Sequence, residues 1–216
     1  MKYLSPDELR ELKDRGYDPV LLDSRADRGR WEAANELREK IESAFADVTL
    51  GEGIGLKEGR GLDDYEGPDV LAQLHAQDER TDWRRLTSEY LLSYQSSISF
   101  TDAEGMRFHL PAWMLAELRD EGIVGLIGSL CRIAPHHEHQ FSLLSPAQRS
   151  VVRDFLEFMR DDPEYSHERA EIYAAIEHIW SQVPTQQSQG ELGVAPNRSL
   201  APSQNSTSSV RGSDDF

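Results

Sequence analysis

Residues 97–110, which read SISFTDAEGMRFHL, carry the strongest β-strand pattern in the chain. Apolar residues alternate with hydroxyl residues before the DAEG segment, and they alternate with Arg107 and His109 after it. Alternation of period two on both sides of a turn that ends in glycine is typical of a β-hairpin. The stretch therefore predicts two antiparallel strands that meet at residues 102–105, with one apolar face and one polar face.

Helical patterns surround this stretch on both sides. Residues 31–48 place apolar side chains three and four positions apart, as in an amphipathic helix. Residues 145–159 open with SPAQ, a capping box, and continue with a similar apolar stripe. Residues 123–133 are apolar and β-branched, which favours a strand and leaves a helix as the alternative. We therefore predict an α+β fold, in which helices pack on a small antiparallel sheet that contains the hairpin.

The composition divides the chain into three parts. Residues 1–27 hold an accessory helix and a polar linker, and residues 28–182 form a single folded domain. Residues 183–216 are rich in glutamine, serine and proline, and their apolar residues follow no period. Such a segment cannot bury enough apolar surface to offset the entropy of ordering, so we predict a disordered C-terminal tail.

The charge of the chain limits its partners. The 216 residues carry a formal net charge of -16, from 23 basic and 39 acidic side chains. This field repels nucleic acid and anionic membrane surfaces, and it is compatible with high solubility or with a basic protein partner. The first residues are charged rather than apolar, which favours the cytoplasm as the location. The sequence does not indicate the oligomeric state.

Residues 50–65, LGEGIGLKEGRGLDDY, are rich in glycine but do not fit a phosphate-binding loop. A Walker loop continues from its lysine into serine or threonine, whereas Lys57 is followed by Glu58. A dinucleotide fingerprint follows a strand, whereas a helix is predicted before this segment. We therefore expect no cofactor. Asp63 and Asp64, at the end of the segment, are candidate binding residues, with a solvated acidic turn as the alternative.

Two other groups of residues are candidates for chemistry. On the predicted hairpin, Arg107 and His109 project side by side from the polar face, where the arginine could clamp an anion and the histidine could carry a proton. The alternative is a face that is merely solvated. In the string PHHEH at residues 135–139, His136 and His139 are the candidate metal ligands, but the loop context favours no native metal site. Cys131 is the single cysteine, which excludes a disulfide within the chain.

Several strings resemble an uncharacterised bacterial family, a domain of unknown function. They include DAEGMRFHLPA at residues 102–112 and LLSPAQR at residues 143–149, and together they span about residues 40–180. The resemblance implies one small α+β domain and supplies no activity. The segment around SPAQR is also similar to bacterial immunity-type and adaptor domains.

These observations lead to a functional hypothesis and a rival. We expect a non-enzymatic, intracellular protein-binding or regulatory module, of an immunity or adaptor kind, because the chain is acidic and has isolated tryptophans. Its candidate binding residues are Asp63, Asp64, Trp83, Arg107 and His109. The rival is a small hydrolase or transferase with Arg107 and His109 as catalytic residues, which requires a concave pocket around those two side chains.

Overall fold

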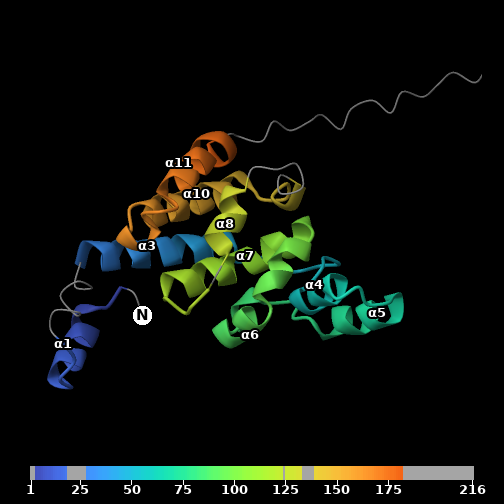
Figure 1. The fold of residues 1–216 in the computed structure, drawn as a ribbon, viewed down its shortest axis with the longest axis horizontal. Helices are drawn as coiled ribbons and strands as arrows, with labels where there is room; N and C mark the ends of the chain where they lie inside the picture. The colour runs from blue at the N-terminus through green and yellow to red at the C-terminus, as the bar shows by residue number, and fades with distance from the viewer. Residues whose placement is uncertain (1–2, 19–27, 124, 133–138, 182–216) are drawn as a thin grey trace, which may run out of the picture. The chain divides into compact units, whose positions relative to one another are not determined.

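The computed structural model describes residues 3–18, 28–123, 125–132 and 139–181, whose regular structure is helical and contains no β-strand (Figure 1). The α-helices of these residues are α1 (Pro6–Asp14), α3 (Arg28–Ala44), α4 (Leu56–Asp63), α5 (Pro68–Gln77), α6 (Ser88–Ser93), α7 (Ala103–Leu118), α8 (Leu126–Cys131), α10 (Pro146–Arg160) and α11 (Arg169–Ala175). Between and after them lie the 3₁₀ segments η1 (Trp83–Arg85), η2 (Gln95–Phe100) and η3 (Pro163–Tyr165), and the π-helical turn η4 (Ile176–Trp180). The predicted α+β class is therefore wrong, because the described part of the chain is entirely helical.

The predicted β-hairpin is replaced by η2 and by α7. The carboxylate of Asp102 accepts a hydrogen bond from the backbone N–H of Gly105 at 2.8 Å, so Asp102 is the N-cap of α7 rather than a hairpin-turn residue. The helix continues through Pro111 to Leu118, and all but three of its residues are buried. A helix that is enclosed on nearly every side needs no polar stripe, and its apolar residues can therefore mimic a period of two.

Several of the helix predictions are confirmed. Ser145 forms the predicted capping box at the start of α10, and Ser5 forms a second capping box at the start of α1, the accessory helix predicted within residues 1–27. The apolar stripe within residues 31–48 lies on α3, where Leu37 and Ile41 are buried. Within residues 123–133 the structure shows α8, so the strand is wrong and the helical alternative is correct for the described positions.

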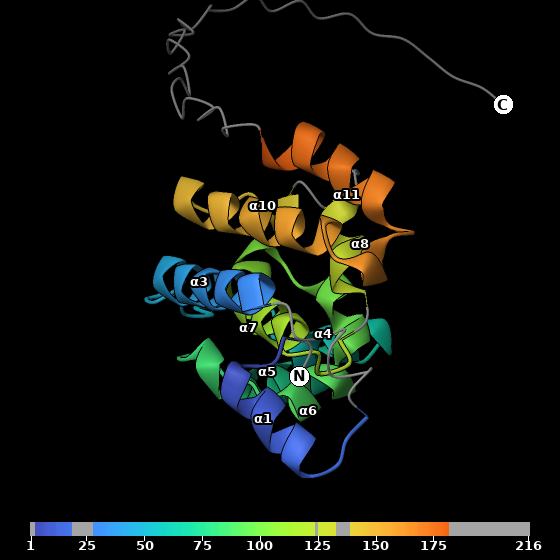
Figure 2. The ribbon, with the colours of Figure 1, turned by 90° about the vertical axis from the view of Figure 1, so that its left-hand side faces the viewer.

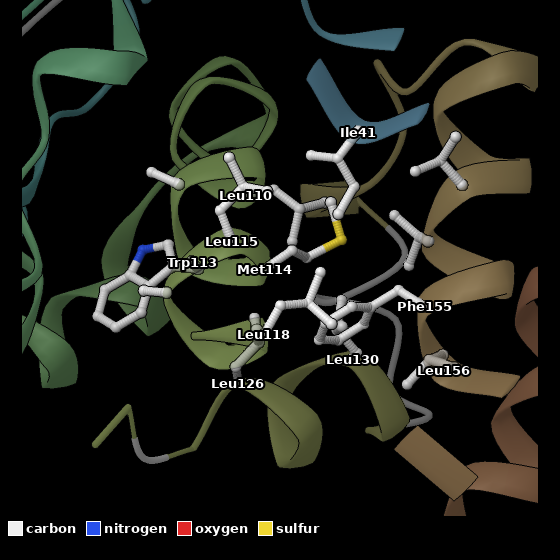
Figure 3. Packing of buried hydrophobic residues seen from close by; sticks show 14 of the residues in the cluster. Ile41, Leu110, Trp113, Met114, Leu115, Leu118, Leu126, Leu130, Phe155 and Leu156 are labelled. Carbon is white, nitrogen blue, oxygen red and sulfur yellow. The ribbon is translucent and has the colours of Figure 1, made fainter. Parts of the chain in front are cut away.

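Helix α7 lies at the centre of the arrangement. α3 packs against α7 on one side and against α10 on the other, and α10 in turn contacts α11 (Figure 2). Across α7 from these helices, α4 packs against α5 and η2. Figure 3 shows the core where α3, α7, α8 and α10 meet, and the side chains of Ile41, Met114, Leu130 and Phe155 within it are fully buried. The packing of apolar side chains from these four helices excludes water from the centre.

The segment before α1 is fixed to the end of α10 by a buried polar cluster. The hydroxyl of Tyr3 donates to the carboxylate of Asp162, and Arg30 donates to the same carboxylate at 3.1 Å. The guanidinium of Arg30 also lies over the ring of Phe158, at 4.4 Å from the ring centroid. Helix α1 itself contains no buried residue, so the residues before it provide its attachment.

The contacts within the chain divide it into two units, Met1–Pro184 and Thr185–Phe216. The second unit lies outside the described residues, as does the predicted disordered tail, and the predicted domain boundaries stay predictions. Among the helices that the structure describes, none combines the length and the apolar character needed to cross a membrane.

Candidate interaction surface at the turn between α4 and α5

The glycine-rich segment predicted not to bind phosphate crosses the N-terminus of α7 at very short range. A Cβ atom on Gly105 would lie 2.2 Å from the carbonyl oxygen of Ile54, and one on Gly53 would lie 2.5 Å from the Cβ of Glu104. The carboxylate of Asp102 accepts a second hydrogen bond, from the backbone N–H of Ile54 at 3.0 Å. These glycines therefore permit the close approach of two backbones, and Asp102 joins them.

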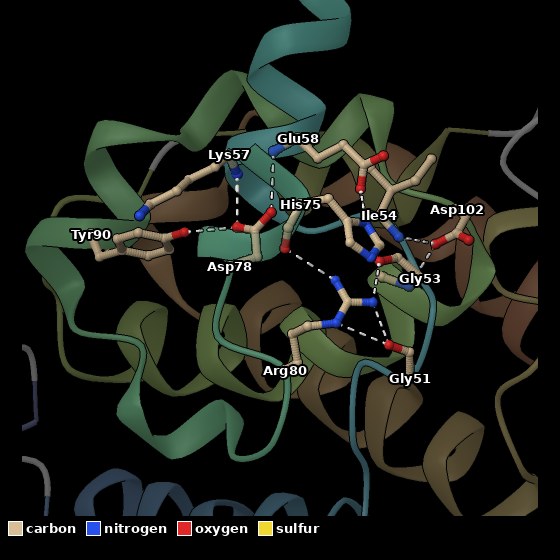
Figure 4. Close-up of polar contacts among 11 residues, drawn as sticks. Gly51, Gly53, Ile54, Lys57, Glu58, His75, Asp78, Arg80, Tyr90 and Asp102 are labelled. Atoms are coloured by element: carbon tan, nitrogen blue, oxygen red, sulfur yellow. Dashed lines mark hydrogen bonds and ion pairs between the residues drawn. The ribbon is translucent and has the colours of Figure 1, made fainter. Parts of the chain in front are cut away.

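A buried aspartate from another segment caps α4. Gly55 occupies the N-cap position and has no side chain, and Asp78 supplies the missing acceptor from the residue after α5. Its carboxylate accepts hydrogen bonds from the backbone N–H groups of Lys57 at 2.9 Å and Glu58 at 3.1 Å (Figure 4). Tyr90 donates to the same carboxylate at 3.1 Å, and burial together with the charge of Asp78 raises the pKa of its hydroxyl. Asp78 thus joins α4, α5 and α6.

Two further contacts fix the end of α5 (Figure 4). The Nδ1 atom of His75 lies 2.7 Å from a carboxylate oxygen of Glu58, which joins α5 to α4. Arg80 donates to the carbonyl oxygens of Gly51 at 3.1 Å and His75 at 3.4 Å, and its own carbonyl accepts from the backbone of Leu50 at 2.9 Å. Arg80 therefore connects the backbone of the segment 49–55 to the end of α5, and the contact of His75 with Glu58 connects α5 to α4.

The turn between α4 and α5 lies at the opposite end of the two helices from this network, and it carries an aromatic side chain that is exposed to solvent. Tyr65 is 96% exposed, and its backbone is left-handed with a φ of 57°. That conformation costs a residue other than glycine about 1–2 kcal/mol. The turn therefore holds Tyr65 outward in spite of a conformational cost. We define the α4–α5 surface by the exposed residues of this turn and their neighbours: Asp63, Asp64, Tyr65, Glu66, Asp69 and Val70.

The α4–α5 surface combines unpaired acidic groups with exposed apolar ones. Arg60 pairs with Asp64 at 3.0 Å, whereas Asp63, Glu66 and Asp69 have no ion-pair partner among the described residues. Val70 is 39% exposed, and α5 contains no buried residue. An exposed aromatic and an aliphatic side chain near several carboxylates are able to bind a surface that combines positive charge with apolar groups.

The structure separates Arg107 from His109, which the sequence had placed together. On α7 the two residues point about 160° apart around the helix axis. His109 is 1% exposed, and its Nδ1 donates to the carbonyl oxygen of Gly105 at 2.6 Å within the same helix. Burial lowers the pKa of His109 to about 4. The side-by-side pair on a solvated strand is therefore wrong, and the geometry on which the hydrolase or transferase alternative depended is missing.

The other candidate residues have separate positions. Trp83 is buried in η1, and its indole N–H donates to the carbonyl oxygen of Phe45 at 2.8 Å. Asp63 is the last residue of α4 and Asp64 is its C-cap, and both belong to the α4–α5 surface, whereas Trp83 lies in η1. His136 lies outside the described residues and His139 is exposed; the described residues hold no group of three His, Cys, Asp or Glu side chains arranged for a metal ion.

Tyr65 is the residue that reasoning from sequence missed. A signal for it exists, because this aromatic residue lies inside the acidic turn DDYEGP, between charged residues that favour contact with water. No local signal identifies Asp78 as the cap of α4, because cap and helix are separated by about twenty residues of chain.

The regular structure of the described residues is helical, and the α4–α5 surface combines carboxylates with an exposed aromatic side chain. A scan against family models matches residues 33–184 to the Family of unknown function (DUF6714). The match covers more than half of the chain, which therefore belongs to this family, and the predicted relation to an uncharacterised family is confirmed. Neither the curated proteins nor the solved structures contain a significant match. The comparisons indicate no specific activity.

Proposed function

We propose that this protein is a non-enzymatic binding module, and that its α4–α5 surface docks a positively charged protein partner. The observation that carries the proposal is the 96% exposure of Tyr65 at a turn whose neighbours are carboxylates. Tyrosine is enriched among the residues that dominate binding energy at protein interfaces, because it offers a large rigid ring and a polar end.

The charge of the surface supports a basic partner. Three of its carboxylates have no ion-pair partner among the described residues, and the whole chain carries a net charge of -16. Such a field accelerates the encounter with a positively charged protein and disfavours acidic competitors. Val70 adds exposed apolar area beside the tyrosine, which a partner can remove from water.

The contacts between α4 and α5 support a role in recognition, because they reduce the conformational freedom that binding would otherwise remove. Asp78 and His75 fasten α4 to α5 through the contacts described above. Leu71 and Leu74 pack on Gly61 so closely that a Cβ atom there would lie 2.9 Å and 2.5 Å from their methyl carbons. A surface that is already ordered loses little entropy on association. The cytoplasmic location expected from the sequence is part of this proposal.

A photo-crosslinking residue tests the proposal in cells of the natural source. It is placed at position 65, and at position 173 as a control, because Tyr173 is also exposed but lies on α11. We expect position 65 alone to capture one protein reproducibly, with a basic surface. That partner is then purified, and its affinity is measured against the wild-type protein, Tyr65→Ala and Tyr173→Ala.

We expect Tyr65→Ala to weaken the complex by about 2 kcal/mol, as for an interface hot spot. Tyr173→Ala leaves the affinity unchanged. The double charge reversal Asp63→Lys with Glu66→Lys slows association and reduces its dependence on salt. Equal affinities of the two tyrosine variants, or identical crosslinks at both positions, would refute the proposal.

A further inference from the structure

A separate pocket of about 140 Å³ lies between α3, η1, α6 and α7. The residues that line its floor include the buried apolar side chains of Trp83, Leu91, Leu115 and Ala116, although most of the surface that the pocket exposes is polar. Its rim is polar and carries the guanidinium groups of Arg84 and Arg119. A cavity of about 150 Å³ with apolar walls is large enough for a benzene ring. The pocket is thus sized for one aromatic ring or one branched aliphatic group.

The cations of the rim are weakly neutralised, although the chain has 39 acidic residues for 23 basic ones. The carboxylate nearest to Arg119 is that of Glu121, at 3.9 Å. Arg84 contacts Asp82 at 3.3 Å, and its guanidinium stacks over the ring of Trp83 at 4.5 Å. Both arginines therefore keep donors for a ligand, because neither is held in a short bidentate pair.

Arg38 adds unsatisfied donors beside the same rim. It precedes Glu42, another pocket residue, by one turn of α3. Its Nε and Nη2 atoms are buried and have no hydrogen-bond acceptor in the structure. Burial and the nearby charge of Arg119 lower the pKa of Arg38. An anion at the rim would reduce the repulsion between these two guanidinium groups.

We propose that this pocket binds a small organic carboxylate whose apolar part is an aromatic ring or a branched aliphatic group. The ring lies on the floor formed by Leu115 and Ala116, and the carboxylate takes its hydrogen bonds from Arg119 and Arg84. The site is independent of the α4–α5 surface, which shares no residue with it. Glu42 is exposed at the rim, so preferred binding of a cationic ligand is the competing outcome of the test.

Three ring compounds of similar shape test the charge preference on the full-length protein. Benzoate, benzamide and benzylammonium are titrated while NMR spectra follow the indole N–H signal of Trp83, whose ring lines the pocket. We expect benzoate to shift this signal with saturation, and benzamide and benzylammonium to bind more weakly by about tenfold or more, since they lack the charged pair with arginine. Equal binding of all three compounds, preferred binding of benzylammonium, or an unshifted Trp83 signal would overturn the proposal.

Two variants test the assignment of residues. Arg119→Gln removes an exposed charge and is expected to weaken benzoate binding about tenfold while leaving benzamide unchanged. Arg153→Gln is the matched control, because Arg153 is exposed on α10 and pairs with Glu157 at 3.0 Å. Ala116→Leu fills the floor and is expected to abolish binding, with circular dichroism as the check on folding. Loss of benzoate binding in the Arg153 variant, or retention in the Arg119 variant, contradicts the assignment.

Discussion

Single carboxylates connect segments that are far apart in the chain. Asp78 accepts from the first turn of α4, and Asp102 accepts from the loop before α4 and from the first turn of α7. Asp162 accepts from Tyr3 and Arg30. Burial of a carboxylate costs free energy unless hydrogen-bond donors replace the water that it loses on folding. Each of these contacts therefore constrains the position of the element that provides the donor.

His109 should make the stability of the protein depend on pH. Its folded pKa is about 4, below the ordinary value of 6.5. The unfolded chain therefore binds a proton at this site as the pH falls below 6.5, while the folded protein does not. Stability should decrease between pH 6.5 and 4, because protons favour the state that binds them. Urea denaturation across this range measures the effect.

Replacement of His109 by leucine should remove this part of the pH dependence. The exposed residue His167 provides the control, and His167→Gln is expected to keep the slope of the wild-type protein. If His109→Leu loses as much stability between pH 6.5 and 4 as the wild-type protein, the buried neutral histidine does not have the assigned role.

At the scale of the element, α7 explains why the apolar pattern was misleading. Its buried residues face α3 on one side and η1 on another, and its N-terminus lies against the glycine-rich segment. Because nearly every face is covered, the sequence does not show the apolar stripe of a surface helix. The local signal that does report the helix is the cap at Asp102.

Gly105 and Gly128 form a matched pair for testing the close approach at α7. Both glycines lie inside helices, where alanine is ordinarily more stable by about 0.5–1 kcal/mol. A Cβ atom on Gly105 would lie 2.2 Å from a backbone oxygen, whereas one on Gly128 would have no neighbour within 4 Å. We expect Gly105→Ala to destabilise the protein by about 1–3 kcal/mol and Gly128→Ala to stabilise it slightly. Equal thermal midpoints for the two variants would contradict this account.

At the scale of the whole molecule, the attachment of α1 depends on a few residues before it. Tyr3 and Leu4 are 5% and 8% exposed, whereas α1 has no buried residue. Tyr3→Ala removes both the contact with Asp162 and the edge-to-face contact with Phe158. We expect hydrogen exchange in α1 to accelerate while exchange in α7 stays slow, because the central core does not include α1.

Mass spectrometry after exchange measures this difference peptide by peptide. Tyr17→Ala serves as the control, since Tyr17 is 53% exposed, and it should leave exchange in α1 unchanged. Slow exchange of α1 in the Tyr3 variant would show that other contacts suffice to hold it.

The candidate surface was predictable only in part. Asp63 and Asp64 follow from the local acidic turn, because no folding is needed to see that charges there stay in water. Tyr65 became a candidate only through its exposure and its left-handed backbone in the folded chain. The pocket near Trp83 combines residues from four segments, and their meeting depends on how the helices pack.

The sequence alone determined the helix starts at Ser5 and Ser145 and the amphipathic character of α3 and α10, since capping and helical periodicity are local properties. It also determined the net charge of -16. Only the tertiary structure decided that residues 97–110 form the end of η2 and the first part of α7, because burial of α7 on nearly every face removes the stripe from which a helix is recognised. Burial likewise decided the role of His109, whose environment is made by residues distant in the chain.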